Sequence, residues 1–511
     1  MYLILTASKS TYITNKIIDN KFRATDANVG KAGTLDLFKL YNESTLSGST
    51  NPVELSRILL KFDFDSLQSL TASKIDITSS TFRARLKLFD VYAGQGVPKN
   101  FKTIVYPLSM SFSEGIGRDV AAFQDIDAAN FITASYSNST ANAWFVSGAN
   151  RGGLLNSADI DYVRSGSFGS GVEDFGKVQL FKEGHEDLDI DITSMVSGTL
   201  AGILPDCGLR LSFSGSQETD TKTRFVKRFG SRHVSDPFKT PQLHISYDDS
   251  IIDHHEDFIF DVSGSLFLNN FHRGTPANIL SGTAASELSG SSCIMLRLEK
   301  QDLSLYFTGS QHNEGTSETG AKGLYSASFA ISLNNSTKVN KTEKLLNLAY
   351  KSGSVEFDEY WTSVDGSVGY HTGSLEIKLP YRTSYNYSPA DLYFHFMNME
   401  QTYCKQDIAR INVFIRNLEA KDKASKLPYE RKSIILSQVY YRIRNLDTGK
   451  VIIPFESATG GTKLSSNSSG LSFELRFESL PAGHVYTIDL LVKDFDQNRI
   501  YESASPKFKV S

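Results

Sequence analysis

The chain has little cysteine, tryptophan and proline, and it contains no long apolar run. Its 511 residues include only Cys207, Cys293 and Cys404, which lie far apart and show no CxxC or Cys/His spacing. We therefore expect reduced thiols, with neither a disulfide framework nor a zinc site. No stretch approaches the ~18 apolar residues of a membrane-spanning helix. The first fifteen residues lack a basic segment, so we predict neither a signal peptide nor membrane contact.

An excess of positive charge is also missing. The 53 Lys and Arg residues face 57 Asp and Glu residues, which gives a net charge of −4 and a pI near 6.2. Proteins that bind nucleic acid usually carry a basic excess, so we do not expect nucleic acid as a partner. The basic segment Lys222–Arg232 is the local exception. It is explained either as a solvated strand face or as a contact with an acidic partner.

The residues that are abundant favour β-structure. Gly, Ser, Thr and Asn are plentiful, 33 Phe and 23 Tyr are available for cores or interfaces, and long Ala/Leu/Glu-rich stretches are absent. In SRILLKFDF, Ile58, Leu60 and Phe62 fall on one face, whereas Leu59 and Lys61 fall on the other. This two-residue alternation indicates a half-buried strand. We predict an all-β fold of tandem β-sandwiches, of which the last two are Ig/fibronectin-like.

Three domains are expected, since the chain is too long for one core. The first covers residues 1–250 and carries a loop-rich insertion near 107–185, which Trp144 would anchor. The charged stretch DDSIIDHHED, residues 248–257, is interpreted as a connector. A β-sandwich over 254–382 and an Ig/fibronectin-like β-sandwich over 383–511 would follow.

Several local signals are specific enough to test. Residues 445–449, Asn-Leu-Asp-Thr-Gly, predict a hairpin turn. Leu480–Val492, LPAGHVYTIDLLV, resembles a tyrosine corner with Tyr486 as its tyrosine, and Tyr325 could act similarly in the second domain. Thr193 or Ser194 is expected to cap a short helix.

The sequence signals for metal-binding or catalytic residues are weak. Asp187, Asp189 and Asp191 share one face of a predicted strand, but calcium needs six to eight oxygens, usually from a glycine-turned loop. In the polar cluster His254–Asp257, adjacent histidines on an extended chain point apart, which suits a linker better than a metal site. No GxSxG, Walker loop or HExxH occurs. We therefore predict no catalytic, cofactor-binding or metal-binding residues and no enzyme, although a triad or carboxylate pair assembled in space stays open.

Six elements in order resemble the DNRLRE-type jelly-roll domain of surface and adhesive proteins. They are SRILLKFDFDSL, ARLKLFDV, DIDITSMV, CGLRLSF, FGSRH and PQLHISY, and they cover about the first 250 residues. The resemblance implies a jelly-roll fold for this part of the chain.

Nearly the full length is similar to virion structural proteins of T4-like, marine-type contractile-tailed phages. The stretches that carry the similarity are SEGIGRDV with DAANF, EDLDIDIT, TKTRFVKRFGSRHVSDPFKTPQLHISYDD, YCKQDIARINVFIRN and LPAGHVYTIDLLV. The chain departs from the family at Phe131, where tryptophan is usual. The resemblance implies a component of the particle that is made in the host cytoplasm.

Together these observations predict a non-enzymatic virion structural protein. Its partners would be other virion proteins in a symmetric multi-copy assembly, with tail, baseplate or neck favoured and capsid decoration next. Exposed sheet edges would supply the contacts. The candidate protein-contact residues are Arg224, Lys227, Arg228 and Arg232. The alternative is a receptor- or glycan-binding adhesin on the particle surface, with Trp144, Trp361 and Tyr381–Tyr387 as candidate glycan platforms.

Overall fold

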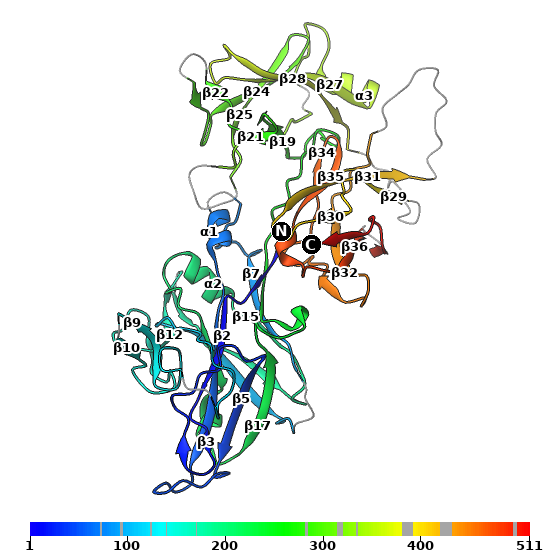
Figure 1. Cartoon of the computed structure of the whole chain (residues 1–511). Helices are drawn as coiled ribbons and strands as arrows, with labels where there is room; N and C mark the ends of the chain where they lie inside the picture. Colours follow the sequence, from blue (N-terminus) through cyan, green and yellow to red (C-terminus); the bar gives the residue numbers. More distant parts are fainter. Residues whose placement is uncertain are drawn as a thin grey trace. The chain divides into compact units, whose positions relative to one another are not determined.

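The computed structural model describes the chain except for residues 72–73, 92–95, 123–124, 139, 170, 282–284, 314–319, 334–335, 381–391, 419–431 and 494–497. Its contacts divide it into two compact units. Unit 1 consists of Met1–Tyr2, Ser69–Thr81 and Ser246–Ser511, and unit 2 consists of Leu3–Gln68 and Phe82–Ile245. The described chain is nearly all-β, as predicted, with tandem β-sandwich architecture (Figure 1).

The main strands of unit 2 form two sheets. In the larger sheet the order is β14 (Lys177–Phe181), β8 (Phe101–Pro107), β16 (Leu209–Phe213), β6 (Val53–Lys61), β5 (Thr34–Tyr41) and β17 (Arg224–Gly230), and β2 (Lys9–Thr14) also pairs with β6. The other sheet has the order β1 (Tyr2–Thr6), β18 (Gln242–Ser246), β7 (Arg83–Leu88) and β15 (Leu188–Asp191).

Both faces of β6 are buried. Ile58 and Leu60 lie on one face of this strand, and Leu59 lies on the other. Leu59 belongs to a core cluster with Trp144 and with other residues of the predicted insertion. The Nε1 of Trp144 donates a hydrogen bond to the carbonyl of Asn130 at 3.0 Å. The insertion is therefore packed on the sheet, and the expectation that Trp144 anchors it is confirmed.

Unit 2 also contains short elements outside its two main sheets. These are β3 (Ile17–Ile18) with β4 (Phe22–Arg23), β9 (Thr133–Ser137) with β10 (Thr140–Ala143), and the sheet of β11 (Gly152–Leu154), β12 (Tyr162–Phe168) and β13 (Gly171–Asp174). Single turns occur at Gly215–Glu218 and Pro237–Lys239.

The helices α1 (Asp65–Thr71) and α2 (Thr193–Leu200) are short. The expected side-chain cap of α2 is wrong. Ile192 occupies the cap position, the hydroxyl of Thr193 accepts a hydrogen bond from the backbone N–H of Ala84, and Asp191 accepts from the N–H of Thr193. The hydroxyl therefore ties the helix to β7.

In unit 1 the residues from about 258 to 378 surround one buried core. The strand order is β19 (Gly264–Asn269), β26 (Leu324–Phe329), β25 (Leu303–Gln311), β24 (Ile294–Lys300), β27 (Ser354–Thr362) and β28 (Gly369–Lys378). Short pairs are β20 (Phe271–His272) with β21 (Thr275–Pro276) and β22 (Leu280–Ser281) with β23 (Ser286–Glu287), and α3 spans Leu345–Ser352. Phe329 stacks on Phe307 and Phe258 inside the core.

The C-terminal part of unit 1 is an Ig-like sandwich. One sheet has the order β29 (Leu392–Phe396), β31 (Ile408–Asn417), β35 (Gly470–Arg476) and β34 (Ser465–Asn467). The second has β30 (Thr402–Tyr403), β38 (Phe508–Val510), β36 (Val485–Lys493), β32 (Val439–Asn445) and β33 (Val451–Ile453), and β37 (Asn498–Tyr501) pairs with β36. The ring of Tyr441 in one sheet stacks on Phe473 of the other at 4.4 Å.

Two local predictions in this sandwich are confirmed. β32 and β33 pair in antiparallel fashion around the turn at 445–449, where Gly449 has φ 67°. Tyr486 is buried and its hydroxyl donates to the carbonyl of Pro481 at 2.6 Å, as a tyrosine corner requires. Tyr325 differs, because its hydroxyl accepts from the N–H of Ile279 and donates to the carbonyl of Leu288, both far away in sequence.

Candidate functional site

The basic strand β17 carries the predicted contact residues, and a bulge sets their directions. Arg224 pairs with Lys39 of β5, whereas Lys227 pairs with Leu37, so β17 has one extra residue between these positions. As a result, Arg224 and Lys227 share the face of the strand that is buried, and Arg228 lies on the opposite face. Without the bulge, simple alternation would have placed the side chains of Lys227 and Arg224 on opposite faces of the strand.

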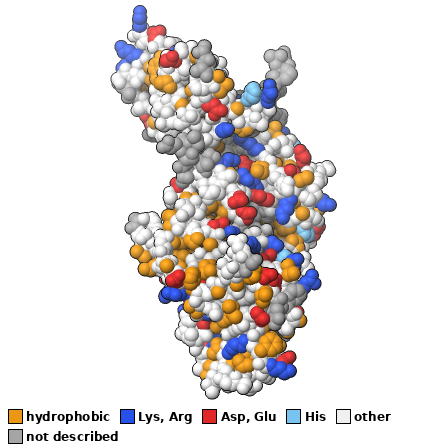
Figure 2. Space-filling view, turned by 60° about the vertical axis from the view of Figure 1, so that its left-hand side comes forward, with side chains coloured by type: hydrophobic (Ala, Val, Ile, Leu, Met, Phe, Trp, Pro, Cys, Tyr) orange, Lys and Arg blue, Asp and Glu red, His pale blue; other side chains and the backbone are white. Residues whose placement is uncertain are grey.

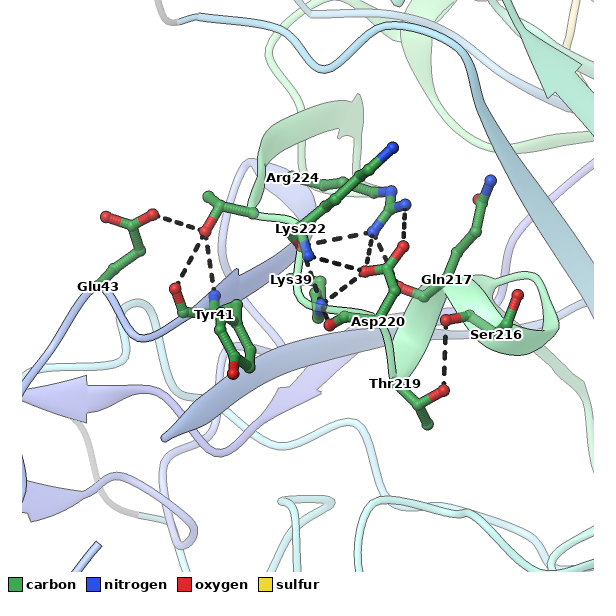
Figure 3. Close-up of polar contacts among 10 residues, drawn as sticks. Lys39, Tyr41, Glu43, Ser216, Gln217, Thr219, Asp220, Lys222 and Arg224 are labelled. Carbon is green, nitrogen blue, oxygen red and sulfur yellow. Dashed lines mark hydrogen bonds and ion pairs between the residues drawn. The ribbon is translucent and has the colours of Figure 1, made fainter. Parts of the chain in front are cut away.

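Arg224 belongs to a cluster around Asp220 (Figure 3). Its two terminal nitrogens donate to the two carboxylate oxygens of Asp220 at 2.8 and 2.5 Å. The fully buried Lys39 donates to Asp220 at 2.8 Å and to the carbonyl of Lys222 at 2.9 Å. The hydrogen bond from Arg224, and to a lesser extent the one from Lys39, holds the pKa of Asp220 well below its usual range.

Lys227 is fully buried, and its ammonium has three acceptors: the carboxylate of Asp90 and, at 2.9 Å each, the carbonyls of Gly184 and Glu186. Burial lowers the pKa of Lys227, and the contact with Asp90 opposes this shift. Three acceptors satisfy all three donors of an ammonium. This side chain therefore works inside unit 2 and offers no surface for a partner, which corrects its interpretation as an exposed contact.

Arg228 and Arg232 retain exposed surface. Arg228 forms a two-pronged pair with Asp36 at 2.7 Å for each bond, and Arg232 contacts Glu114 at 2.9 Å. Their side chains are 27% and 36% exposed. The acidic neighbours of all four cations thus lie in unit 2 itself. A contact of Arg228 or Arg232 with another protein stays a prediction.

The two tryptophans that were proposed as glycan platforms are not at the surface. Trp144 and Trp361 are both buried in cores, so neither can stack on a ligand at the surface. The third candidate group, Tyr381–Tyr387, lies outside the described residues.

A buried ionic cluster in unit 1 was not foreseen. The two ring nitrogens of His255 contact Asp253 at 2.5 Å and Glu359 at 3.2 Å, and the Nε1 of Trp361 also donates to Glu359. Burial disfavours the charged ring, but the hydrogen bonds to the two carboxylates outweigh it and raise the pKa of His255 to about 10. The imidazolium is therefore a fixed cation near neutral pH.

The predicted connector at 248–257 follows the division between the two units at Ile245 and Ser246, and it is packed within unit 1. The segment before His255 pairs with β34, since Ile252 forms a parallel bridge with Ser466 and Asp253 donates its N–H to the carbonyl of the same serine. The sequence did hold a signal for the cluster. Glu359 occupies an inward position of β27 between Phe357 and Trp361, where alternation calls for an apolar side chain.

The three aspartates that suggested calcium are used separately. Asp187 accepts from the N–H of Asp90, Asp189 pairs with Arg85 at 2.8 Å, and Asp191 accepts at the start of α2. Among the described residues, no group of three His, Cys, Asp or Glu side chains is placed to hold a metal ion. None of the described helices has the length and hydropathy needed to cross a membrane.

Exposed apolar side chains line one margin of the larger sheet of unit 2. β14 is the terminal strand of that sheet, and its outward side chains Val178 and Leu180 are 47% and 46% exposed. The half-buried Ile104 of β8 lies directly opposite Val178. The side chain of Gln179 instead bonds the backbone of β15 through Asp187 and Asp189. We call Val178, Leu180 and Ile104 the β14 strip.

Comparisons with known proteins give no family. No family model matches the chain, and no curated protein matches it. Among solved structures, it is similar to dimeric latent PorU from Porphyromonas gingivalis, with 10% identity, a TM-score of 0.17, and coverage of 94% of this chain and 34% of that one. Trypsin-activated alpha-2-macroglobulin from Escherichia coli follows, with 9% identity, a TM-score of 0.14, and coverage of 91% and 23%.

A third similar structure is a protein from Corynebacterium diphtheriae described as membrane anchored. It has 9% identity and a TM-score of 0.15, and the match covers 100% of this chain and 96% of that one. The chain spans about a third or less of the first two proteins. At TM-scores this low, the similarities support no conclusion about function.

Proposed function

We propose that the chain is a non-enzymatic structural protein of a contractile-tailed phage virion, which acts by assembling with other particle proteins. Tail, baseplate or neck is the favoured location, and capsid decoration is next. The proposal starts from the near full-length resemblance described above. Tandem β-sandwiches suit this role, because they hold a fixed geometry and present sheet edges to neighbours.

The β14 strip is the observation that carries the proposal. Apolar side chains on a terminal strand favour association, because covering them removes apolar surface from water. Val178 and Leu180 point the same way, and Ile104 continues the strip onto β8. Hydrophobic side chains form several groups on the face of the molecule shown in Figure 2. A partner with an apolar strand or sheet face would bury the β14 strip.

The basic strand β17 is no longer the main candidate for the assembly contact. Arg224 and Lys227 stabilise unit 2 from inside, whereas the strip is free of ion pairs and accessible. The assembly contact is thus assigned to apolar burial on β14 rather than to charge on β17. Arg228 and Arg232 remain secondary candidates.

Incorporation of variants into particles tests the proposal. Val178→Asp with Leu180→Asp places two charges in the interface, and we expect at least about a tenfold drop in incorporation, because charges buried there lose their hydration and Lys102, opposite Leu180, can pair with only one of them. Ile500→Asp on β37 is the matched control, since Ile500 is also 47% exposed but lies in unit 1. Circular dichroism and melting of the purified chains check that the variants fold.

Two outcomes would contradict the proposal. Normal incorporation of the folded double variant would remove the β14 strip from the interface. Absence of the wild-type chain from purified virions, or hydrolysis of polysaccharide by the purified chain, would defeat the structural role itself. No described tryptophan is exposed to support the adhesin alternative.

A further inference from the structure

Unit 1 contains an open hollow of about 500 Å³ with an unusual lining. Amide side chains dominate it, together with one guanidinium and two exposed apolar side chains, and no carboxylate lines it among the described residues. The side chains that matter for the argument are Asn269, Asn412, Asn467, Arg410, Phe271 and Met397.

The backbone next to the hollow is held by one asparagine. Just beyond β29, the side chain of Asn398 accepts from the N–H of Asn412 at 2.8 Å and donates to the carbonyl of Arg410 at 2.6 Å. The residue between them, Ile411, is fully buried in the core. Because side chains alternate along a strand, Arg410 and Asn412 both point away from the core. Asn398 thus fixes the two polar side chains side by side.

These polar groups have spare hydrogen-bonding capacity. Within the described part of the chain, the side-chain amides of Asn269 and Asn412 have no hydrogen-bond partner, and Asn467 uses only its oxygen, which accepts from Ser469. Arg410 donates to the hydroxyl of Ser472 at 3.2 Å, and none of the described carboxylates pairs with it. Several donors and acceptors and one positive charge therefore face the hollow.

The chemistry of the lining indicates the ligand. An amide both donates and accepts, as a sugar hydroxyl does, so amides match a polyhydroxylated ligand. Phe271 and Met397 are 55% and 61% exposed and offer apolar surface to the C–H face of a sugar ring. Glu474 lies directly opposite Arg410 on β35, but it pairs with Lys74 and Arg476 instead. The guanidinium of Arg410 is therefore left to bind a carboxylate in a two-pronged contact.

From this arrangement we infer that the hollow binds an acidic oligosaccharide, with Arg410 contacting a carboxylate of the sugar and Asn412, Asn269 and Asn467 contacting its hydroxyls. Nucleic acid fits less well, because its phosphates call for several cations and the hollow holds one. The inference goes beyond the proposed assembly role and does not depend on it, since the β14 strip belongs to unit 2.

Binding to the full-length chain tests the inference. An array of acidic and neutral oligosaccharides is probed first, and then titration calorimetry compares trigalacturonate with its methyl ester, which has the same rings without charge. We expect the wild type to retain acidic members of the array and to prefer the charged form. Arg410→Gln should weaken acidic binding about tenfold, the loss typical of one charge-assisted hydrogen bond. Asn412→Ala should weaken binding of every saccharide that is retained.

Lys507→Gln is the matched control, because it removes one exposed positive charge of unit 1 outside the hollow and should bind like the wild type. Equal melting temperatures show that the variants are folded. Failure of the wild type to retain any acidic oligosaccharide would overturn the inference, as would unchanged affinity of folded Arg410→Gln. Retention of single-stranded DNA in place of saccharides would also overturn it.

Discussion

His255 shows how a single residue can couple the stability of unit 1 to pH. Its side chain is held between two buried carboxylates, and its pKa rises from 6.5 to about 10. The folded state therefore binds this proton more tightly than the unfolded chain does. The resulting stabilisation is complete below about pH 6.5, declines as the pH rises, and is lost above about pH 10.

We predict that His255→Gln destabilises unit 1 by about 3–5 kcal/mol at pH 6, because it leaves two carboxylates without their cation. The difference from the wild type should shrink steadily toward pH 10. Urea unfolding followed by Trp361 fluorescence in a Trp144→Phe background measures it. His272→Gln, at an exposed position, should leave the curve unchanged. A difference that is constant across this pH range would contradict the assignment of the charge.

Lys227 illustrates why the sequence could show the charge but not its use. The run Thr221–Arg232 is plainly basic, yet a bulge turns Lys227 to the buried side, and Asp90, its partner, is 137 positions away. A bulge depends on tertiary packing, so alternation alone cannot reveal it. The hydrogen bonds of Asn398 to the backbone of Arg410 and Asn412 could not be predicted either, because they depend on where β29 ends.

At the scale of the element, two tyrosines secure loops in different ways. Tyr486 donates one hydrogen bond to Pro481, five residues before it in the chain. Tyr325 both donates and accepts, and it holds together Ile279 and Leu288, which flank the β22–β23 pair. The first closes a local corner, whereas the second stabilises a distant hairpin.

We predict that Tyr325→Phe costs more than Tyr486→Phe, about 2–3 against about 1 kcal/mol, because the first leaves two backbone groups without a partner. Native-state hydrogen exchange resolved by peptide measures each effect separately, at β22–β26 for Tyr325 and at β36 for Tyr486. Each variant serves as the control for the other. Equal losses, or a larger loss at β36, would show that the second hydrogen bond of Tyr325 adds little.

Strands and turns were the part that the sequence could predict. The strand at β6, the turn at 445–449 and the corner at Tyr486 depend on neighbouring residues, and all three were found, although both faces of β6 are buried where one was expected. The cap of α2 was missed because Thr193 bonds to Ala84, more than a hundred positions earlier. The candidate hollow was missed for the same reason, since its lining comes from several strands. Local patterns predict elements, but contacts distant in sequence build sites.

At the scale of the whole molecule, the chain passes back and forth between its compact units. Ser69–Thr81 belongs to unit 1, although the residues on both sides of it belong to unit 2. Lys74 in this segment pairs with Glu474 at 2.8 Å. The two tryptophans are divided as well, with Trp144 in unit 2 and Trp361 in unit 1.

We predict that unit 2 folds alone when a short Gly/Ser loop replaces residues 69–81 in a chain of residues 3–245. It has its own buried cluster around Trp144 and its own ion pairs, so little of its core is lost. Urea unfolding followed by Trp144 fluorescence should give one cooperative transition. The reference is full-length Trp361→Phe, whose Trp144 transition should have the same midpoint. A broad, non-cooperative transition in the isolated unit would show that it needs the rest of the chain.

The path of Ser69–Thr81 also has a consequence for synthesis. Glu474 emerges from the ribosome 400 residues after Lys74, a delay of roughly 20–80 s at translation speeds of about 5–20 residues per second. During this interval Ile75, which is fully buried in the finished protein, has no completed unit 1 to join. The order of translation therefore makes unit 2 the first to mature, while the segment Ser69–Thr81 inside its sequence waits for residues still to be made.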